Sequence, residues 1–246
     1  MGTHGYTRVE GSVVPLSPAA ASCRTVSPLL LLPLPDTLAD LLQVAVHQIL
    51  YARHVYPPQL FERVAKYGAA LRQSRMPDVN VYIAEFCAGI KSDLEKGTVA
   101  GVHVVIVDTV RAEPVERFTF QMDRLGYDAS TGWTCADKDI QFMSLCQKLL
   151  VADCFMSRPT KDCTFVLYVE YRDKTSRPTP SSGLAPTNSW ILAEDKSMRM
   201  DDARAVPIRT FENRLLRVQP SMSSQNIGVD SPTHRAATST GVATLV

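Results

Sequence analysis

The chain has 246 residues, of which 45% are hydrophobic and 21% are charged, a composition typical of a globular protein with one or two domains. That composition excludes a collagen, a coiled coil and a wholly disordered chain. Lys and Arg number 26 against 25 Asp and Glu, and the formal net charge of +1 gives no overall field that attracts nucleic acid or an acidic membrane. We therefore expect no strong direct binding to nucleic acid and no membrane association.

The six cysteines are scattered and include no C-x-x-C pair, which predicts reduced thiols in a cytosolic or nuclear protein. The apolar run near the N-terminus, residues 27–35 (SPLLLLPLP), is too short to span a bilayer and is interrupted by Pro33 and Pro35. It also lacks the small-residue cleavage site of a secretory signal. The sequence thus predicts neither a signal peptide nor a transmembrane helix.

Composition divides the chain into three parts. Residues 1–36 hold five prolines and no lasting periodicity, and residues 221–246 are rich in Ser and Thr with few large apolar side chains. We expect both to be disordered extensions. Residues 37–220 then form one domain, long enough to bury roughly 70% of the surface of its unfolded chain.

The domain opens with a predicted helix over residues 37–56, with Thr37 as its N-cap and Pro57 as its stop. Its apolar residues cover most of the circumference, which predicts a central helix packed from several sides. The spacing of apolar residues predicts a second, amphipathic helix over 77–97.

Strands are predicted over residues 99–108 and 115–122, which should form an antiparallel hairpin. A third helix follows at about 137–155, and a strand rich in β-branched and aromatic residues covers 163–172. These elements predict an α+β fold in which three helices back a largely antiparallel sheet.

Residues 173–188 contain three prolines and three serines, and they are too long for an ordinary connection inside a compact domain. Strand character returns at 189–194 and at 206–219. Two strands cannot bury a core alone, so we expect both to join the sheet that precedes them.

The common phosphate, dinucleotide, esterase and zinc-protease motifs are absent. His47 and His54 share a face of the first helix and could converge on a ligand, but no acid lies beside them at metal-ligand spacing, which favours a core and a surface histidine. Cys163 is the candidate thiol nucleophile, although no sequence neighbour lowers its pKa. The cysteines that could in principle bind zinc lack close pairs: Cys135, Cys146, Cys154 and Cys163. We expect no enzyme, no metal and no cofactor.

Trp190 begins one of the late strands, directly after the long loop. A tryptophan here is either a core residue or an anchor that closes over a bound peptide, because a large aromatic buries much area at little entropic cost. The residues alone favour neither interpretation.

Six segments carry a family likeness: Leu42–Pro57 (LQVAVHQILYARHVYP), Phe61 with Lys66-Tyr67, Val104–Asp108 (VVIVD), Val115–Phe120 (VERFTF), Ser189–Asp195 (SWILAED) and Arg204–Thr210 (RAVPIRT). In order and spacing they resemble the HORMA-domain family, and within it the branch of accessory, non-catalytic subunits of DNA polymerase zeta. The likeness covers essentially residues 37–220. It implies three helices against a sheet and a C-terminal safety belt, residues 173–220, that pins a partner peptide to the sheet edge.

The resemblance also implies binding residues. In the relatives, the peptide pocket uses a tyrosine on the second helix and a tryptophan on the first belt strand, which correspond to Tyr82 and Trp190. The outer face of the belt receives the C-terminal domain of a scaffold polymerase through a leucine, a glutamine and a tyrosine. Gln219 matches the glutamine, whereas Ala205 and Ser221 occupy the other two positions.

The function implied is that of an adaptor in translesion DNA synthesis and DNA damage tolerance, in the nucleus and also in the cytoplasm. Its expected partners are a short proline-containing segment of the catalytic subunit of DNA polymerase zeta and a Y-family scaffold polymerase. A HORMA-remodelling AAA+ ATPase and cell-cycle regulators are further expected partners. The alternative is a spindle-checkpoint HORMA protein that regulates the anaphase-promoting complex. An enzyme that uses Cys163 or the His47 and His54 pair is a third hypothesis, from another class.

Overall fold

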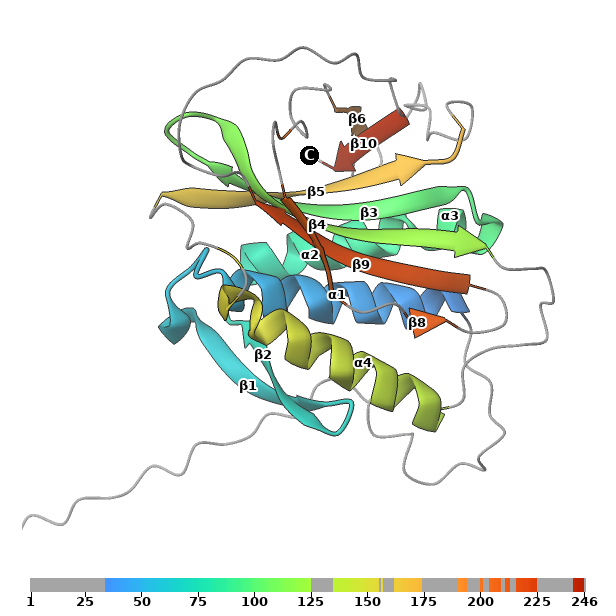
Figure 1. The fold of residues 1–246 in the computed structure, drawn as a ribbon, viewed down its shortest axis with the longest axis horizontal. Coiled ribbons are helices and arrows are strands. Elements are labelled where there is room, and N and C mark those ends of the chain that lie inside the picture. The colour runs from blue at the N-terminus through green and yellow to red at the C-terminus, as the bar shows by residue number, and fades with distance from the viewer. Residues whose placement is uncertain are drawn as a thin grey trace, which may run out of the picture.

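The computed structural model describes residues 34–124, 135–154, 156, 162–173, 190–193, 200, 204–208, 211–212, 216–224 and 241–245. They form a sheet, a layer of helices against one face of it, and a two-stranded hairpin on the far side of the helices (Figure 1). The α+β fold class predicted from the sequence is therefore confirmed.

In chain order the elements are α1 (Leu34–Ala52), η3 (Pro58–Leu60), β1 (Phe61–Lys66), β2 (Ala69–Ser74), α2 (Pro77–Gly89), α3 (Lys91–Lys96), β3 (Val99–Asp108), β4 (Glu113–Arg124), α4 (Cys135–Leu150), η4 (Ala152–Cys154), β5 (Cys163–Tyr171), β6 (Trp190–Leu192), β7 (Arg204–Pro207), β8 (Phe211–Glu212), β9 (Leu216–Ser224) and β10 (Gly241–Leu245).

Helix α1 is the centre of the fold. It contacts α2, α3, α4 and strand β2, and it lies beneath the sheet (Figure 1). Ile49 and Leu50 are fully buried and Leu41 is 1% exposed, because apolar side chains surround nearly the whole helix. The predicted central helix is confirmed. In the part of the chain that the structure describes, no helix is long and apolar enough to cross a membrane.

The start of α1 differs from the prediction. The helix begins at Leu34, with Pro35 in the first turn, where a missing N–H deprives no helical carbonyl of a donor. Thr37 is therefore a buried residue inside the helix rather than its N-cap. Asp40, one turn further along the helix, accepts a hydrogen bond of 2.6 Å from the hydroxyl of Tyr67 in the hairpin turn.

The end of α1 also comes earlier than predicted, at Ala52 rather than at the prolines. His54 has a left-handed φ of +53°. Its N–H donates to the carbonyl of Tyr51 (3.2 Å), and the N–H of Val55 donates to that of Leu50 (3.1 Å). This pair of bonds is a Schellman ending, whose left-handed residue is usually Gly. A histidine at that position hid the ending from the sequence pattern.

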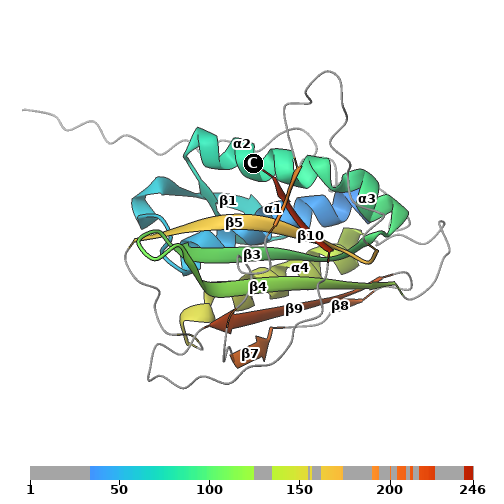
Figure 2. The same ribbon diagram turned by 90° about the horizontal axis from the view of Figure 1, so that it is seen from above.

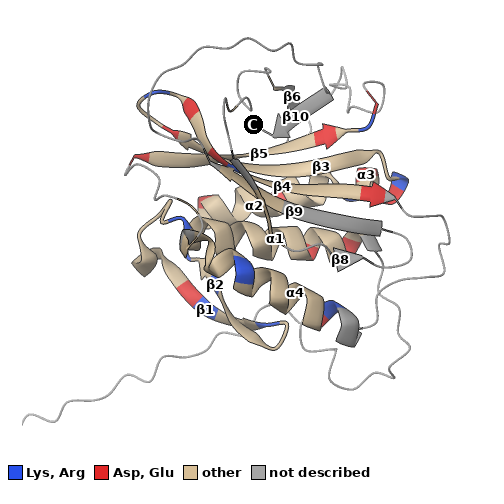
Figure 3. Cartoon of the chain, viewed as in Figure 1, with Lys and Arg blue, Asp and Glu red and all other residues tan. Residues whose placement is uncertain are grey.

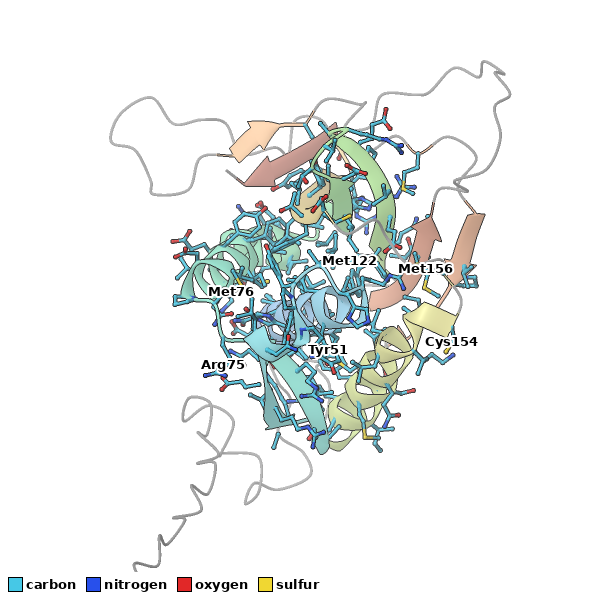
Figure 4. The ribbon with its side chains drawn as sticks, turned by 90° about the vertical axis from the view of Figure 1, so that its left-hand side faces the viewer. Tyr51, Arg75, Met76, Met122, Cys154 and Met156 are labelled. Carbon is cyan, nitrogen blue, oxygen red and sulfur yellow. The ribbon has the colours of Figure 1, made fainter. Side chains whose placement is uncertain are left out.

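The hairpin of β1 and β2 was not predicted. Tyr67 and Gly68 connect the strands with φ values of +53° and +72°, which is the type I′ geometry of a two-residue hairpin loop. Tyr51 of α1, labelled in Figure 4, packs edge-on against Phe61 of β1, with ring centroids 5.4 Å apart. Few β-branched residues occur in these strands, so the sequence carried little strand signal.

The helix predicted over 77–97 is two helices, α2 and α3, separated at Ile90. Its predicted start and end are confirmed. Gly97 closes α3 with a φ of +66°, and its N–H donates to the carbonyl of Leu94 (3.1 Å). Helix α4 ends at Leu150, where the prediction continued to residue 155, and the 3-10 turn η4 follows it.

Strands β3 and β4 form the predicted antiparallel hairpin, and β5 pairs antiparallel with the other side of β3. The described strands of the main sheet run in the order β6-β10-β5-β3-β4-β9-β7, with β8 paired to β9 (Figure 2). The late strands therefore join the existing sheet, as predicted. The segment predicted over 206–219 is three strands, β7, β8 and β9. The loop predicted over 173–188 lies outside the described residues, apart from Asp173.

The C-terminal part of the chain differs from the expectation of a disordered tail over 221–246. Strand β9 continues to Ser224, and Met222 and Ser223 within it are buried. Strand β10 is formed by Gly241–Leu245 and pairs with both β5 and β6. The Ser/Thr-rich composition concealed these strands because their partners come from distant parts of the sequence.

One buried ion pair joins α1 to the sheet. Charged residues of both signs are spread over the sheet and the helices in Figure 3, but the side chain of Arg53 is 0% exposed and that of Glu116 is 3% exposed. Arg53 Nε lies 2.8 Å from Glu116 Oε2, and Nη2 lies 2.6 Å from Oε1. This two-bond geometry holds the C-terminal end of α1 against β4.

We expect the single substitution Arg53→Met or Glu116→Leu to lower the free energy of unfolding by about 3 to 5 kcal/mol, because each leaves a buried charge without this partner. The double variant should lose much less, since it buries neither charge. Urea unfolding of the unsubstituted chain, the two single variants and the double variant measures the coupling free energy between Arg53 and Glu116. Strictly additive losses would show that the two residues act independently.

Candidate functional site

The outer edge of β5 is the candidate site, because Tyr82 reaches it from α2. The N–H of Leu167 in β5 donates to the Tyr82 hydroxyl at 3.2 Å. At the end of the strand, the N–H of Arg172 points the other way and donates to the carbonyl of Thr98, which precedes β3. Successive N–H groups of a strand alternate in direction. The N–H groups of Leu167, Val169 and Tyr171 therefore face the outer edge.

Aromatic side chains line this edge. Phe165 packs edge-on against Tyr82, with ring centroids 5.6 Å apart, and against Tyr56, with centroids 6.3 Å apart. Burial raises the pKa of Tyr56, and a hydrogen bond with Thr164 partly opposes that shift. Tyr82 itself is partly buried. A cluster of aromatic rings that carries hydroxyl groups suits an extended peptide, which needs both apolar contacts for its side chains and hydrogen-bond partners.

Trp190 lies in β6, at the end of the sheet beyond β5. Its backbone is opposite Leu245 of β10, and β10 lies between β6 and β5. The structure therefore brings the strand of Trp190 and the helix of Tyr82 to the same end of the sheet, with β10 between β6 and β5, although the two residues are distant in sequence. The side chain of Trp190 is outside the described part.

Comparison with known proteins settles the family. A sequence model of the HORMA domain matches residues 36–168, more than half of the chain. This chain belongs to the HORMA-domain family. The match ends within β5, so β6 to β10 lie beyond it.

Relatives of this HORMA protein cover most of its length. The mitotic spindle assembly checkpoint protein MAD2B of Homo sapiens is 32% identical over 187 residues, which cover 75% of this chain and 87% of the relative. The DNA polymerase zeta processivity subunit of Schizosaccharomyces pombe is 31% identical over 191 residues, with 72% and 86% covered. The mitotic spindle checkpoint protein MAD2 of Zea mays is 24% identical over 181 residues, with 73% and 83% covered.

Solved structures agree with the fold. A chain of the mitotic checkpoint complex superposes with a TM-score of 0.64 at 19% identity, covering 78% of this chain and 98% of that chain. HTP-2 of C. elegans, bound to HTP-3 closure motif 1, superposes with a TM-score of 0.59 at 11% identity, covering 79% and 89%. The α+β architecture of this HORMA protein is therefore that of its family.

The positions matched to the scaffold-polymerase interface lie at the opposite end of the HORMA sheet. Gln219 and Ser221 belong to β9, where they pair with Gln121 and Thr119 of β4. Ala205 of β7 pairs with Ser223, two residues further along β9. The three positions thus lie close together on adjoining strands. Ser221 is half-buried, and the side chains of Ala205 and Gln219 are outside the described part.

A polar cluster that the sequence did not predict crosses the middle of the sheet. His103 Nε2 lies 3.2 Å from Glu170 Oε2, and its Nδ1 lies 3.1 Å from the hydroxyl of Thr119. The hydrogen bond from His103 lowers the pKa of Glu170, burial opposes it, and the charge of Arg117 adds to it. Residues 103, 119 and 170 stand on three neighbouring strands, and the sequence contains no signal of that register.

The candidates for catalysis do not assemble into a site. His47 is buried in α1, while His54 lies beyond the end of the helix. Burial raises the pKa of Cys146 to about 12, which suppresses its thiolate. Cys163 is half-buried at the start of β5. Among the described residues, no group of three or more His, Cys, Asp or Glu side chains could hold a metal ion.

We expect Tyr82→Phe to increase the amide hydrogen exchange of Leu167 and to lower the free energy of unfolding by about 1 kcal/mol, because the hydroxyl no longer accepts this N–H. Exchange followed by NMR measures the first effect, and urea unfolding measures the second. Val81→Ala is the control, since Val81 is the neighbouring residue of α2 and is 53% exposed. Unchanged exchange at Leu167 in Tyr82→Phe would contradict the assignment.

The buried His47 makes stability depend on pH. Burial, and then the charge of Lys66, lower its pKa from 6.5 to about 4. As the pH falls from about 6.5 to about 4, the unfolded chain binds this proton and the folded chain does not. Folding stability should therefore decrease over that range, by about 3 kcal/mol at most.

Urea unfolding at pH 7 and pH 4.5 tests the His47 prediction. His47→Gln should lose less stability between the two values than the unsubstituted chain, whereas His54→Gln, at an exposed position, should lose as much. An equal pH dependence in His47→Gln would show that other groups account for the loss.

Proposed function

We propose that this chain is a peptide-clamping adaptor subunit of translesion DNA polymerase zeta. The observation that carries the proposal is identity of 32% to human MAD2B and 31% to the fission yeast polymerase zeta processivity subunit, over about three quarters of the chain in each case. In this proposal, the outer edge of β5 receives a short proline-containing segment of the catalytic subunit. The geometry of Tyr82 and Phe165 supports that location at the N-terminal half of β5, beyond the residues that pair with β10.

The proposed mechanism is strand addition followed by closure. An extended peptide beside β5 gains main-chain hydrogen bonds, and the aromatic wall gives it side-chain contacts. Residues 173–220, the proposed safety belt, then hold the peptide against the sheet, with Trp190 on the first belt strand as an anchor. Release is slow because the belt must open before the peptide leaves. No bond is made or broken, so the proposed adaptor is not an enzyme and needs no cofactor.

The proposed second partner is the C-terminal domain of a Y-family scaffold polymerase. Its positions, Ala205, Gln219 and Ser221, lie on β7 and β9, while the peptide edge is on β5. Strands β3 and β4 separate the two edges. Both partners can therefore bind at once, as a bridge requires. A HORMA-remodelling AAA+ ATPase and cell-cycle regulators complete the proposed partner set, in the nucleus and also in the cytoplasm.

The second candidate is a spindle-checkpoint HORMA protein that acts on the anaphase-promoting complex. The similarity to Zea mays MAD2 favours it, over 181 residues at 24% identity. This identity is lower than the 31 to 32% to MAD2B and to the polymerase subunit over a similar length. We therefore rank the adaptor first.

A peptide array tests the adaptor proposal. Overlapping synthetic peptides that cover the polymerase zeta catalytic subunit of the same organism are titrated against the full chain. We expect one proline-containing peptide to bind, and Trp190→Ala to weaken it roughly 30-fold, because a buried tryptophan anchor contributes about 2 kcal/mol or more. Trp133→Ala is the matched control, since Trp133 is the other tryptophan and lies between β4 and α4.

Affinity purification from cells complements the array. We expect the catalytic subunit of polymerase zeta among the bound proteins. Recovery of mitotic checkpoint proteins alone, together with an array that shows no binding, would favour the second candidate instead.

A further inference from the structure

A small pocket lies between helix α1 and the β1–β2 hairpin, on the side of α1 that faces away from the main sheet (Figure 1). Its volume is about 50 Å³. A single water needs about 10 to 15 Å³ of such a volume, so the pocket has room for a few water-sized groups. Its polar lining consists of Gln43 and His47 of α1, Lys66 of β1, and Arg72 and Gln73 of β2. No Asp or Glu is among the described residues that line it.

His47 contributes a buried hydrogen-bond donor to this lining. The residue is only 3% exposed. The N–H of Ser74 in β2 donates to its Nδ1 at 3.4 Å, so the neutral ring carries its own proton on Nε2. Nε2 is buried and has no hydrogen-bond partner among the described residues. Buried donors are nearly always satisfied in folded proteins. An unsatisfied N–H on a residue that lines a pocket therefore indicates that the pocket receives an acceptor.

The amides beside His47 offer further donors. Gln43 lies one helical turn before His47, so the two side chains share a face of α1. Gln73 lies on β2, next to Ser74. Each glutamine carries an NH₂ group that can donate two hydrogen bonds, and neither side chain is hydrogen-bonded to another described residue. An acceptor in the pocket can thus be reached from α1 and from the hairpin.

The charge of the lining is positive. Asp40 accepts a hydrogen bond from Lys66 Nζ, which uses one of the three N–H groups of the ammonium and makes that pair neutral as a whole. Arg72 has no such partner: its guanidinium lies over the ring of Tyr51, 4.8 Å from the centroid, and it forms no ion pair with a described residue. Burial, and then the charge of Lys66, lower the pKa of His47 to about 4, so His47 adds a donor but no charge at neutral pH.

We propose that this pocket binds a carboxylate group, with one oxygen accepting a hydrogen bond from His47 Nε2 and the other facing Lys66. A carboxylate carries acceptors alone, and its three heavy atoms suit the volume of the pocket better than the five of a phosphoryl group. The carboxylate comes either from a small free anion or from the side chain of an acidic residue in a partner. The pocket is separated from β5 by α1, so the inference is independent of the proposed adaptor function.

The first test is a titration of the full chain with sodium acetate at pH 7, followed by NMR of the His47 ring. Acetate should move the Nε2–H proton downfield and slow its exchange with water at least tenfold, with a Kd of about 10 mM. Acetamide has the same shape but no charge, and it should do neither. Equal effects of acetate and acetamide, as a water-filled pocket would give, or no effect of either, would overturn the proposal.

The second test places the carboxylate in the chain itself. Gln43→Glu should raise the pKa of His47 from about 4 toward its ordinary value of 6.5, because a nearby negative charge favours the imidazolium form. The same variant should no longer respond to acetate. Gln59→Glu is the matched control, since Gln59 is exposed in η3 and lies outside the pocket. An unchanged pKa of His47 in Gln43→Glu, together with an undiminished response to acetate, would contradict the proposed site.

The role of Lys66 is tested by Lys66→Met, which keeps most of the apolar stem and removes the ammonium. Acetate should bind this variant about tenfold more weakly, because a charge-assisted contact is lost. Lys96→Met is the control, since the side chain of Lys96 is 64% exposed on α3. Thermal unfolding confirms that each variant is folded. Equal acetate affinity in Lys66→Met and in the unsubstituted chain would show that the second oxygen is misplaced and that the proposed arrangement is wrong.

A blocked glutamate, N-acetyl-glutamate N-methylamide, distinguishes the two sources of the carboxylate. If it shifts the His47 signal as acetate does, and N-acetyl-glutamine N-methylamide does not, the pocket receives an acidic side chain of a partner. If acetate alone acts, the pocket is a site for a small free carboxylate. Each result supports the proposal, and neither bears on the binding of polymerase peptides, which the peptide array measures separately.

Discussion

The fold depends on one constraint, which is that helix α1 must be covered on every side. Its buried residues surround the helix, so a sheet alone could shield only part of it. The sheet covers one side, α2 and α3 a second, α4 a third, and the β1–β2 hairpin the remainder. The buried pair of Arg53 and Glu116 then ties this helix to β4. Because the helix layer packs on one face of the sheet, the edges of the sheet remain for partners to bind.

The part of the fold that the sequence predicted is the part determined by local periodicity. The bounds of β3, the start of α2 and the central place of α1 follow from apolar spacing and from Pro77 and Gly97. Elements determined by contacts between distant residues were missed. The β1–β2 strands have little intrinsic strand preference and form because α1 needs a cover. Helix α1 stops early through a left-handed His54, a conformation more often adopted by Gly.

The candidate site likewise contains residues that could be predicted from the sequence and residues that could not. Tyr82 was predicted through a family resemblance, and the structure adds its local contact: its hydroxyl accepts the N–H of Leu167 in β5. Phe165 and Tyr56 were not predicted as site residues, because a residue in a strand and a residue beyond the end of a helix share no sequence pattern. Strand β10 was hardest to foresee. Its uncharged small residues resemble a solvated tail, and its place between β5 and β6 is a property of the whole sheet.

Pro207 has a consequence for the other end of the sheet. It ends β7, the outermost strand there, opposite Ser221 of β9, and it is exposed. Without an N–H, proline interrupts the donor row that a further strand would need, and short proline-bearing edge strands are a common protection against aggregation through edge pairing. The two ends of the sheet are therefore chemically unequal. A partner that docks on β7 must therefore rely on side chains more than on main-chain hydrogen bonds, and pairing between the sheets of identical molecules is disfavoured at this end.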